Sequence, residues 1–261
     1  MSDVQVAVSH PRVESLAEAP SVQLEGVSVR FRVPLERHST FKEFAIRWAQ
    51  RRLQFRDHWA LRGVDLTLAP GEIVGVVGPN GAGKTTLLKT MAGVLHPTEG
   101  NVRIRGTLAP LLELGAGFHP ELTGRENVYL YGTLLGHTRR ELEDQYGAIL
   151  EFADIGDFID APLRTYSSGM IARLAFSVAT QRFADVLLVD EVLAVGDLGF
   201  QHKCRERMEA FRERGATIVL VSHDPGLVTG MCQRAVWLES GQVRAHGPAD
   251  IVLDAYVETR R

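Results

Sequence analysis

Residues 78–86 read Gly78-Pro-Asn-Gly-Ala-Gly-Lys-Thr-Thr86, with the spacing G-x-x-x-x-G-K-T of a phosphate-binding loop. The apolar, β-branched run Ile73–Val77 before the loop predicts a buried strand, and Lys84–Met91 after it predicts a helix. Glycines let successive N–H groups point at one centre, and the helix N-terminus adds partial positive charge. A Gly-rich turn that only joins strand to helix is the alternative, but the strand, spacing, lysine and threonine together favour phosphate binding.

This loop supplies a first set of predicted ligand contacts. Lys84 is expected to reach the β- and γ-phosphates of a nucleotide, and Thr85 to ligate Mg²⁺. The residues predicted to bind the nucleotide here are Gly78, Pro79, Asn80, Gly81, Ala82, Gly83, Lys84, Thr85 and Thr86.

Length and composition limit the classes of protein to which this chain can belong. The 261 residues suffice for one large α/β domain or a domain with a subdomain, and the net charge of -3 lacks the basic footprint of a nucleic-acid binder. Cys204 and Cys232 lie far apart without metal spacing, which favours core residues in a reducing compartment. We find no apolar run of membrane-span length and no signal peptide, and residues 1–20 are polar and predicted to be disordered. A cytoplasmic protein is expected, with any membrane role exerted through a partner.

The chain alternates between strand and helix patterns. Val22–Phe31 and Ala60–Leu68 alternate like strands of an antiparallel subdomain, whereas about 108–180 reads as a helical insert within an α/β domain of residues 21–258. Two apolar strands, Val186–Val189 and Thr217–Ser222, follow. The remaining predicted elements are a strand at Asn101–Arg105, helices at Val128–Leu135, Arg139–Phe152, Ser168–Thr180, about Phe200–Arg214 and Pro248–Tyr256, and a hairpin of Arg234–Leu238 with Gln242–Ala245.

The segment Val186-Leu-Leu-Val-Asp-Glu191 is an apolar strand that ends in two carboxylates. A buried parallel strand delivers such residues to the edge of the sheet where the phosphate loop also lies. We expect Asp190 to hold the Mg²⁺ shell and Glu191 to orient and polarise the attacking water. Carboxylates that only cap a strand at the surface are the alternative, and the nearby phosphate loop argues against it.

Two further segments fit a nucleotide site. Tyr166-Ser-Ser-Gly-Met170 precedes a helix, so Ser167 and Ser168 are either ordinary N-caps or part of a second anion site. Two phosphate-binding helix starts in one chain suggest head-to-tail pairing of two copies. His223 ends a strand beside the Asp190 strand, so contact with the γ-phosphate is plausible, although a loop histidine is often merely solvated.

The order of these motifs resembles the ATP-binding subunit of ABC transporters from about Val22 to Tyr256. Within that family, the chain is similar to the branch that exports lipid-linked O-antigen, teichoic acid or related glycans. The segments that carry this narrower resemblance are Leu112-Glu-Leu-Gly-Ala-Gly-Phe-His-Pro-Glu-Leu-Thr-Gly-Arg-Glu-Asn127, Thr165-Tyr-Ser-Ser-Gly-Met170, Val189-Asp-Glu-Val-Leu-Ala-Val-Gly-Asp197 and Phe200-Gln-His-Lys-Cys204.

The resemblance implies further roles. Phe31 falls where an aromatic side chain stacks on adenine, and Trp59 is a second candidate. Ser167 and Gly169 would contact the γ-phosphate across a dimer, and Asp197 would lie in the loop that couples the two sites. The glutamine that usually senses Mg²⁺ and the membrane subunit is missing. The nearest polar candidate is Glu113, although a gapless alignment places Leu114 there.

Residues Pro34–His58 form an insertion between the first two strands. Thr40–Glu43 reads as a capping box, and aromatic side chains fall on one helical face with basic residues around it. An amphipathic helix packed on its own domain is one interpretation. A surface that meets the membrane subunit or anionic headgroups is the other.

The resemblance, together with these motifs, implies a P-loop ABC-type nucleotide-binding domain with an antiparallel β subdomain and an inserted helical subdomain. It would bind ATP and Mg²⁺ as a homodimer under two copies of a membrane permease, at the cytoplasmic face of the cell membrane. Hydrolysis would drive export of a lipid-linked polysaccharide, with no nucleic-acid partner and no added C-terminal glycan-binding domain. The alternatives are a small-solute or drug exporter, a soluble non-transport ABC ATPase and a regulator without turnover.

Overall fold

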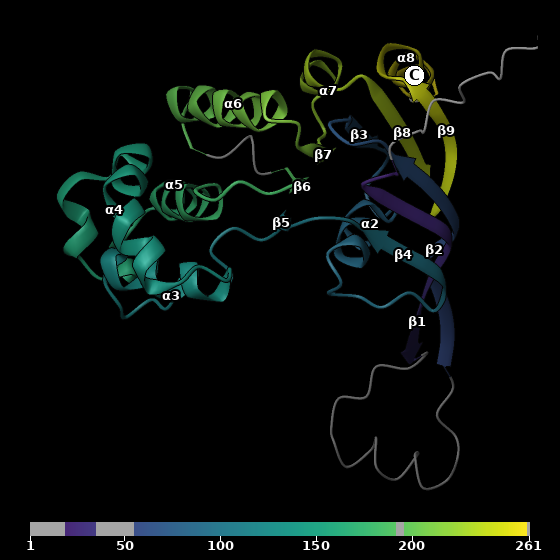
Figure 1. Cartoon of the computed structure of the whole chain (residues 1–261). Helices are drawn as coiled ribbons and strands as arrows, with labels where there is room; N and C mark the ends of the chain where they lie inside the picture. The colour runs from purple at the N-terminus through teal and green to yellow at the C-terminus, as the bar shows by residue number, and fades with distance from the viewer. Residues whose placement is uncertain (1–18, 35–54, 192–195, 260–261) are drawn as a thin grey trace, which may run out of the picture.

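The computed structural model describes residues 19–34, 55–191 and 196–259. Within these residues the strands form two sheets, one of three strands in the order β2-β1-β4 and one of six in the order β5-β6-β7-β3-β8-β9 (Figure 1). The strands are β1 (Val22–Pro34), β2 (Phe55–Leu68), β3 (Ile73–Val77), β4 (Glu99–Ile104), β5 (Leu108–Leu111), β6 (Val186–Asp190), β7 (Thr217–Val221), β8 (Arg234–Glu239) and β9 (Gln242–Pro248).

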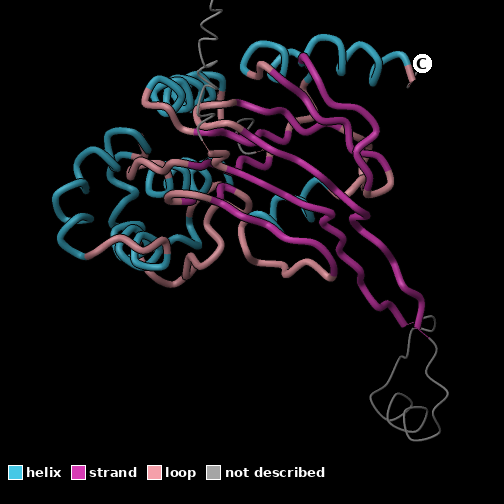
Figure 2. The backbone as a smooth tube through the Cα atoms, turned by 45° about the vertical axis from the view of Figure 1, so that its right-hand side comes forward, coloured by secondary structure: helices cyan, strands magenta, loops and turns pink. Residues whose placement is uncertain are grey.

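Some helices cover the six-stranded sheet. Others form a separate lobe, which the chain builds after β5 and before it returns to the sheet as β6 (Figures 1 and 2). The α-helices are α2 (Lys84–Met91), α3 (Gly124–Leu134), α4 (Arg139–Ala153), α5 (Ser168–Ala179), α6 (Leu198–Glu213), α7 (Pro225–Met231) and α8 (Ala249–Glu258), and the 3₁₀ helices are η1 (Gly156–Asp160) and η2 (Leu163–Thr165). The lobe consists of α3, α4, α5 and the two 3₁₀ helices. Both α3 and α4 begin at a capping box, with Thr123 and Glu126 in the first and Thr138 and Glu141 in the second.

The central strands of the larger sheet are short and almost wholly buried. Strands β3, β5, β6, β7 and β8 run parallel, whereas β9 pairs with β8 antiparallel. Every residue of β3 and β7 is buried, which explains why these strands read as continuous apolar runs in the sequence. Because β3, β6 and β7 are parallel neighbours, the residues that follow them meet at one edge of the sheet.

Alternate residues of these strands enter two different cores. Ile73 and Leu187 belong to a cluster with the helical lobe and with α6 and α8. Val74 and Leu188 belong to a second cluster that includes Leu87 of α2 and the inner faces of β1 and β2. The larger sheet is therefore covered on both faces, as expected for an α/β domain.

The fold class predicted from the sequence is confirmed, with differences at the borders. Residues 108–111 form β5 and pair with β6, so the helical insert begins after this strand rather than at 108. Helix α7 was not predicted, because seven residues carry too little periodicity. Pro34 and residues 55–58 belong to β1 and β2, which shortens the predicted insertion at both ends. Residues 35–54, with the predicted capping box, and residues 1–18 of the predicted tail 1–20 lie outside the described residues.

Candidate nucleotide-binding site

The phosphate loop joins β3 to α2, as the sequence predicts. Two of its glycines have no room for a side chain. A Cβ on Gly78 would lie 2.1 Å from the carbonyl oxygen of Leu238, and one on Gly83 would lie 2.5 Å from that of Ala60. Both positions have positive φ, 154° and 105°, which other residues rarely adopt. The backbone of the loop is thus pressed against β8 and β2, and this packing fixes its curve.

Lys84 is buried at the start of α2, with 7% of its surface exposed. Its ammonium donates to the carbonyl oxygens of Gly78, at 2.8 Å, and Pro79, at 3.1 Å. The cation is therefore held inside the loop, where the N–H groups at the helix start also favour an anion. This arrangement brings a full positive charge and the helix dipole to the same place.

Thr85 and Asp190 meet across the sheet edge. The hydroxyl of Thr85 donates to Oδ2 of Asp190 at 2.9 Å. Burial raises the pKa of Asp190 and the charge of Glu191 raises it further, while the Thr85 bond and Lys84 lower it. A partly buried carboxylate and a hydroxyl that lie this close supply oxygen atoms of the kind that Mg²⁺ binds.

Glu191 and His223 form a second pair at the same edge. Nε2 of His223 lies 2.8 Å from Oε1 of Glu191, and about half of each side chain is exposed. Glu191 has a φ of 56°, and its N–H donates to the carbonyl of Val221 at 3.0 Å. A positive φ is uncommon for a residue other than glycine, and here it occurs directly after β6 ends. Glu191 and His223 lie side by side, and both line the cavity that also contacts the phosphate loop.

One cavity of about 410 Å³ joins these groups to the β1–β2 hairpin. Phe31 lines it, and 38% of Phe31 is exposed. Trp59 does not line it, because Trp59 pairs with Arg30 while Phe31 pairs with His58, so the two aromatic side chains point to opposite faces of the hairpin. The residues that line the cavity are Phe31, His58, Ala60, Asn80, Gly81, Ala82, Gly83, Lys84, Thr85, Thr86, Glu191 and His223.

The second predicted anion site lies apart from the first. Ser167 caps α5 and accepts from the N–H of Met170 at 3.2 Å. A cavity of about 490 Å³ is lined by Ser167, Ser168, Gly169 and Asp197, together with Arg173, and by no residue of the phosphate loop. Within one chain, the structure does not bring the two predicted parts of the site together.

Asp197 has a structural role in addition to its predicted one. It caps α6 by accepting from the N–H of Phe200 at 2.9 Å, and it forms an ion pair with Arg173 of α5. These contacts, led by the Phe200 bond, hold the pKa of the Asp197 carboxyl below its usual range. Arg173 was not predicted from the sequence, because only the fold reveals that a residue of α5 faces the start of α6.

Glu113 does not join Thr85 and Asp190. Its carboxylate pairs with the ammonium of Lys89 at 2.7 Å, and this hydrogen bond lowers the pKa of Glu113. Leu114 packs partly buried against the core of the helical lobe. Among the described residues, Glu113 is therefore engaged by Lys89 and makes no hydrogen bond to Thr85 or Asp190, and its role in place of the missing glutamine stays a prediction.

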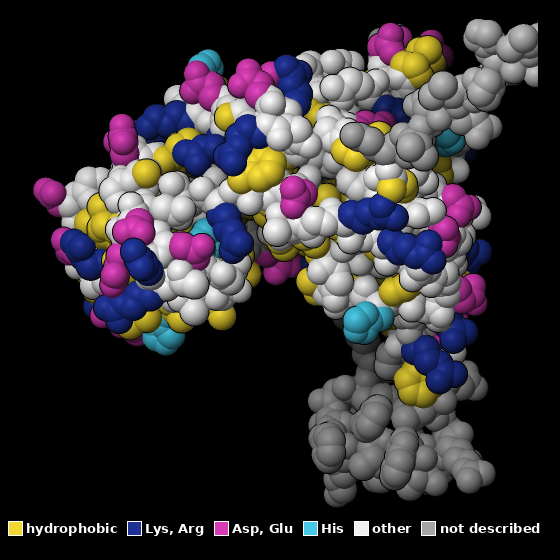
Figure 3. All heavy atoms as spheres, in the orientation of Figure 1, with side chains coloured by type: hydrophobic (Ala, Val, Ile, Leu, Met, Phe, Trp, Pro, Cys, Tyr) yellow, Lys and Arg dark blue, Asp and Glu magenta, His cyan; other side chains and the backbone are white. Residues whose placement is uncertain are grey.

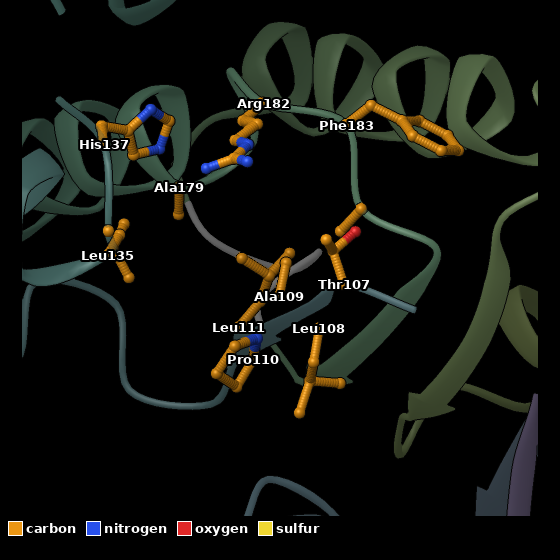
Figure 4. Close-up of a pocket in the computed structure, with 12 residues that line it drawn as sticks. Thr107, Leu108, Ala109, Pro110, Leu111, Leu135, His137, Ala179, Arg182 and Phe183 are labelled. Carbon is orange, nitrogen blue, oxygen red and sulfur yellow. The ribbon is translucent and has the colours of Figure 1, made fainter. Parts of the chain in front are cut away.

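A separate cavity of about 250 Å³ lies between β5, the end of α3 and the connection from α5 to β6 (Figure 4). None of the predicted site residues lines it. Its walls are largely apolar and include Leu108, Leu135 and Phe183. The polar side chains that line it include the guanidinium of Arg182 and the imidazole of His137. In Figure 3 the surface is hollowed between the helical lobe and the β1–β2 hairpin, and charges of both signs are interspersed over this face.

The comparisons with known proteins fit this geometry. Residues 61–194 match the family described as "ABC transporter". The chain belongs to the ABC transporter family. It carries the ATP-binding domain of that family, whose activity is ATP hydrolysis.

Curated relatives are similar over most of the chain. It is 48% identical over 204 residues to the O-antigen export system ATP-binding protein RfbB of Klebsiella pneumoniae, covering 78% of this chain and 83% of that one. It is 46% identical to the protein of the same name from Myxococcus xanthus, covering 88% of this chain and 54% of that one. It is 38% identical to the teichoic acids export ATP-binding protein TagH of Shouchella clausii, covering 91% of this chain and 65% of that one.

Solved structures support the fold. A dimeric post-hydrolysis state of the ATP-binding cassette MJ0796, bound to ADP and Pi, superposes with a TM-score of 0.69 at 22% identity, covering 87% of this chain and 98% of that one. A structure of an ATP-binding subunit of an ABC transporter gives a TM-score of 0.70 at 22% identity, covering 90% and 92% of the two chains. Among the described helices of our structure, none has the length and hydrophobicity to span a bilayer.

Proposed function

We propose that this protein is the ATP-hydrolysing subunit of an ABC transporter that exports a lipid-linked polysaccharide. The observation that supports a polysaccharide as the cargo is the 48% identity to an O-antigen export ATP-binding protein, together with the 38% identity to a teichoic acids export ATP-binding protein. One relative is named for O-antigen export and the other for teichoic acids export, so the proposal is limited to polysaccharide cargo of that kind.

Hydrolysis would use the groups at the edge of the larger sheet. Lys84 binds the β- and γ-phosphates, and Glu191 orients and polarises the attacking water. His223, held 2.8 Å from Glu191, contacts the γ-phosphate and keeps the carboxylate in place. Phe31 stacks on adenine at the far end of the cavity, and Trp59, on the other face of the hairpin, is set aside.

The residues present fit Mg²⁺. Thr85 and Asp190 supply a hydroxyl and a carboxylate 2.9 Å apart, and Mg²⁺ is commonly held by one or two such groups together with water and substrate phosphates. In the described part of the chain no cluster of three or more His, Cys, Asp or Glu could hold a metal on its own. When bound, the ion would neutralise charge on the phosphates.

The proposed assembly is a homodimer held by two membrane subunits at the cytoplasmic face of the membrane. The separation of the two predicted anion sites into different cavities supports this proposal, since the cavity at Ser167–Gly169 shares no lining residue with the phosphate loop. Ser167, Ser168 and Gly169 would then act on the nucleotide held by the partner copy. Asp197, which bridges α5 and α6, would couple the two sites.

A single replacement tests both parts of the proposal. In Glu191→Gln we expect ATP binding to persist and phosphate release to fall about 100-fold or more, because the carboxylate that activates water is lost. In the source cell the same replacement should remove surface glycan and make lipid-linked glycan accumulate inside.

The matched control is Arg139→Ala, which removes an exposed side chain of α4 whose ion pair is with Glu143. It should leave ATPase activity and surface glycan unchanged. Near-normal phosphate release in Glu191→Gln would contradict the assignment of Glu191. Loss of hydrolysis with unchanged surface glycan would instead favour a small-solute exporter.

A further inference from the structure

The nucleotide cavity has an end that faces away from the phosphate loop. It is formed by the β1–β2 hairpin, where Phe31 and His58 are direct cross-strand partners. Side chains of such partners lie on the same face of a sheet, about 5 Å apart at Cβ. The imidazole of His58 therefore stands beside the ring of Phe31, and both line the cavity.

The position of Ala60 relates the hairpin end of the cavity to the phosphate loop. Its carbonyl oxygen packs against Gly83 of the loop, so Ala60 lies directly over the phosphate-binding backbone. His58 is two residues earlier in β2 and on the same face, about 6.8 Å further along the strand. A nucleotide with its phosphates at the loop would run along this face, so its sugar and base would reach His58 and Phe31.

His58 differs from its neighbours in polarity. Among the described residues at this end of the cavity, the side chains of Phe31 and Ala60 contain only carbon, whereas the side chain of His58 carries two ring nitrogens. No hydrogen bond joins its imidazole to another described residue. A neutral imidazole has one N–H donor and one acceptor nitrogen, which match ribose hydroxyls and the edge of a base.

We propose that the His58 imidazole hydrogen-bonds the nucleoside of bound ATP, while Phe31 stacks on its base. This inference rests on the proposed function, because it needs the phosphates at Lys84. Phe31 alone would accept any base, since stacking is not selective. The hydrogen bond of His58 would strengthen the binding of ligands that carry a nucleoside. It would not strengthen the binding of a phosphate chain alone.

The test compares ligands with and without a nucleoside. Dissociation constants of ATP, ADP and inorganic tripolyphosphate are measured for the full chain and for His58→Ala. We expect ATP and ADP to weaken together by about 5-fold, the value of one hydrogen bond, with tripolyphosphate unchanged. His58→Gln, whose amide keeps a donor and an acceptor, should recover part of the loss.

The control is Asp57→Asn, next to His58 on the other face of β2, where Asp57 pairs with Arg30. It should leave the ratio of ATP to tripolyphosphate affinity unchanged. Unaltered ATP affinity in His58→Ala would overturn the inference, and so would an equal loss for tripolyphosphate, which would place His58 on the phosphates. Lys84→Ala separates the two proposals. If Lys84→Ala weakens the binding of all three ligands while His58→Ala alters the binding of none, only this inference fails. If Lys84→Ala alters the binding of none of the three, the proposed function fails.

Discussion

Single residues at the edge of the larger sheet carry most of the predicted chemistry. Lys84, Thr85, Asp190, Glu191 and His223 were all named from the sequence, because each follows or opens an element whose pattern is clear. The structure adds distances of 2.9 Å for Thr85 to Asp190 and 2.8 Å for His223 to Glu191. Parallel neighbours necessarily bring their ends together, so residues far apart in the chain could be grouped without coordinates.

Other residues could not be found in this way. The choice between Phe31 and Trp59 depends on strand register, and β1 has register shifts between Val27 and Val29 and between Val29 and Arg30. Each shift can invert the face on which a side chain lies, so an alternating pattern cannot be extended across it. The contribution of His58 to the cavity was missed because His58 was assigned to the insertion Pro34–His58, whereas it belongs to β2.

His137 gives a prediction for pH. It is 6% exposed, and no described group hydrogen-bonds its Nδ1. Burial lowers its pKa, with Glu141 opposing the shift and Arg182 adding to it. The unfolded chain takes up a proton near pH 6.5, whereas the folded chain does so only at lower pH. The stability that His137 contributes is thus present above about pH 6.5 and lost as the pH falls toward the folded pKa.

We therefore expect the midpoint of thermal unfolding to fall less between pH 7.5 and 5.5 in His137→Leu than in the wild type. The replacement removes the imidazole that is protonated in the unfolded state. The part of the stability that the wild type loses in acid through His137 is then no longer lost. An exposed histidine on the surface, His96, serves as the control, and His96→Gln should keep the wild-type response. Equal acid sensitivity in His137→Leu and the wild type would show that His137 does not drive it.

At the scale of elements, the start of α3 is packed against the segment that leads into α5. A Cβ on Gly124 would lie 2.1 Å from the hydroxyl of Tyr166 and 3.0 Å from the carbonyl oxygen of Ile159. The Tyr166 hydroxyl donates to the carbonyl of Phe158, and burial raises the pKa of Tyr166 to about 12. Tyr166 directly precedes Ser167, so this contact sets where the predicted second anion site begins.

Gly124→Ala should lower stability by about 1–3 kcal/mol, because the methyl group must displace a buried tyrosine or a backbone carbonyl. The measurement is urea unfolding followed by circular dichroism. Gly147→Ala is the matched control, since Gly147 lies in helix α4 and a Cβ added there would meet no atom within 4 Å. It should be neutral or stabilising by up to about 1 kcal/mol. Equal effects at both positions would contradict the packing argument.

Elements were predictable where their patterns were long. Helices α4 and α5 were placed within one residue of their observed ends, since apolar periodicity and caps agree. Strand β5 was missed because its four residues include Pro110, which argues against a strand. It is nevertheless paired on one side only, with β6, at the edge of the six-stranded sheet, where a proline is tolerated.

At the scale of the whole molecule, the chain holds two half-sites that do not meet. Lys84 lies at the start of α2 beside the larger sheet, and Gly169 lies in the helical lobe. No lining residue is shared between the cavities at the two places. Two copies arranged head to tail would close each nucleotide between the phosphate loop of one copy and Ser167–Gly169 of the other.

Mixed dimers of two single mutants distinguish this arrangement from two independent sites. Lys84→Ala removes the phosphate-binding cation, and Gly169→Asp adds a negative charge at a position where the nearest atom to a new Cβ, Ser167 Oγ, is 3.8 Å away. A dimer of one Lys84→Ala chain and one Gly169→Asp chain keeps one intact composite site, whereas each pure mutant keeps none. With a tag on one chain, we predict ATP-dependent capture of the other chain from the mixture, well above capture in either pure sample. Capture no greater than in the pure mutants would contradict head-to-tail completion of the site.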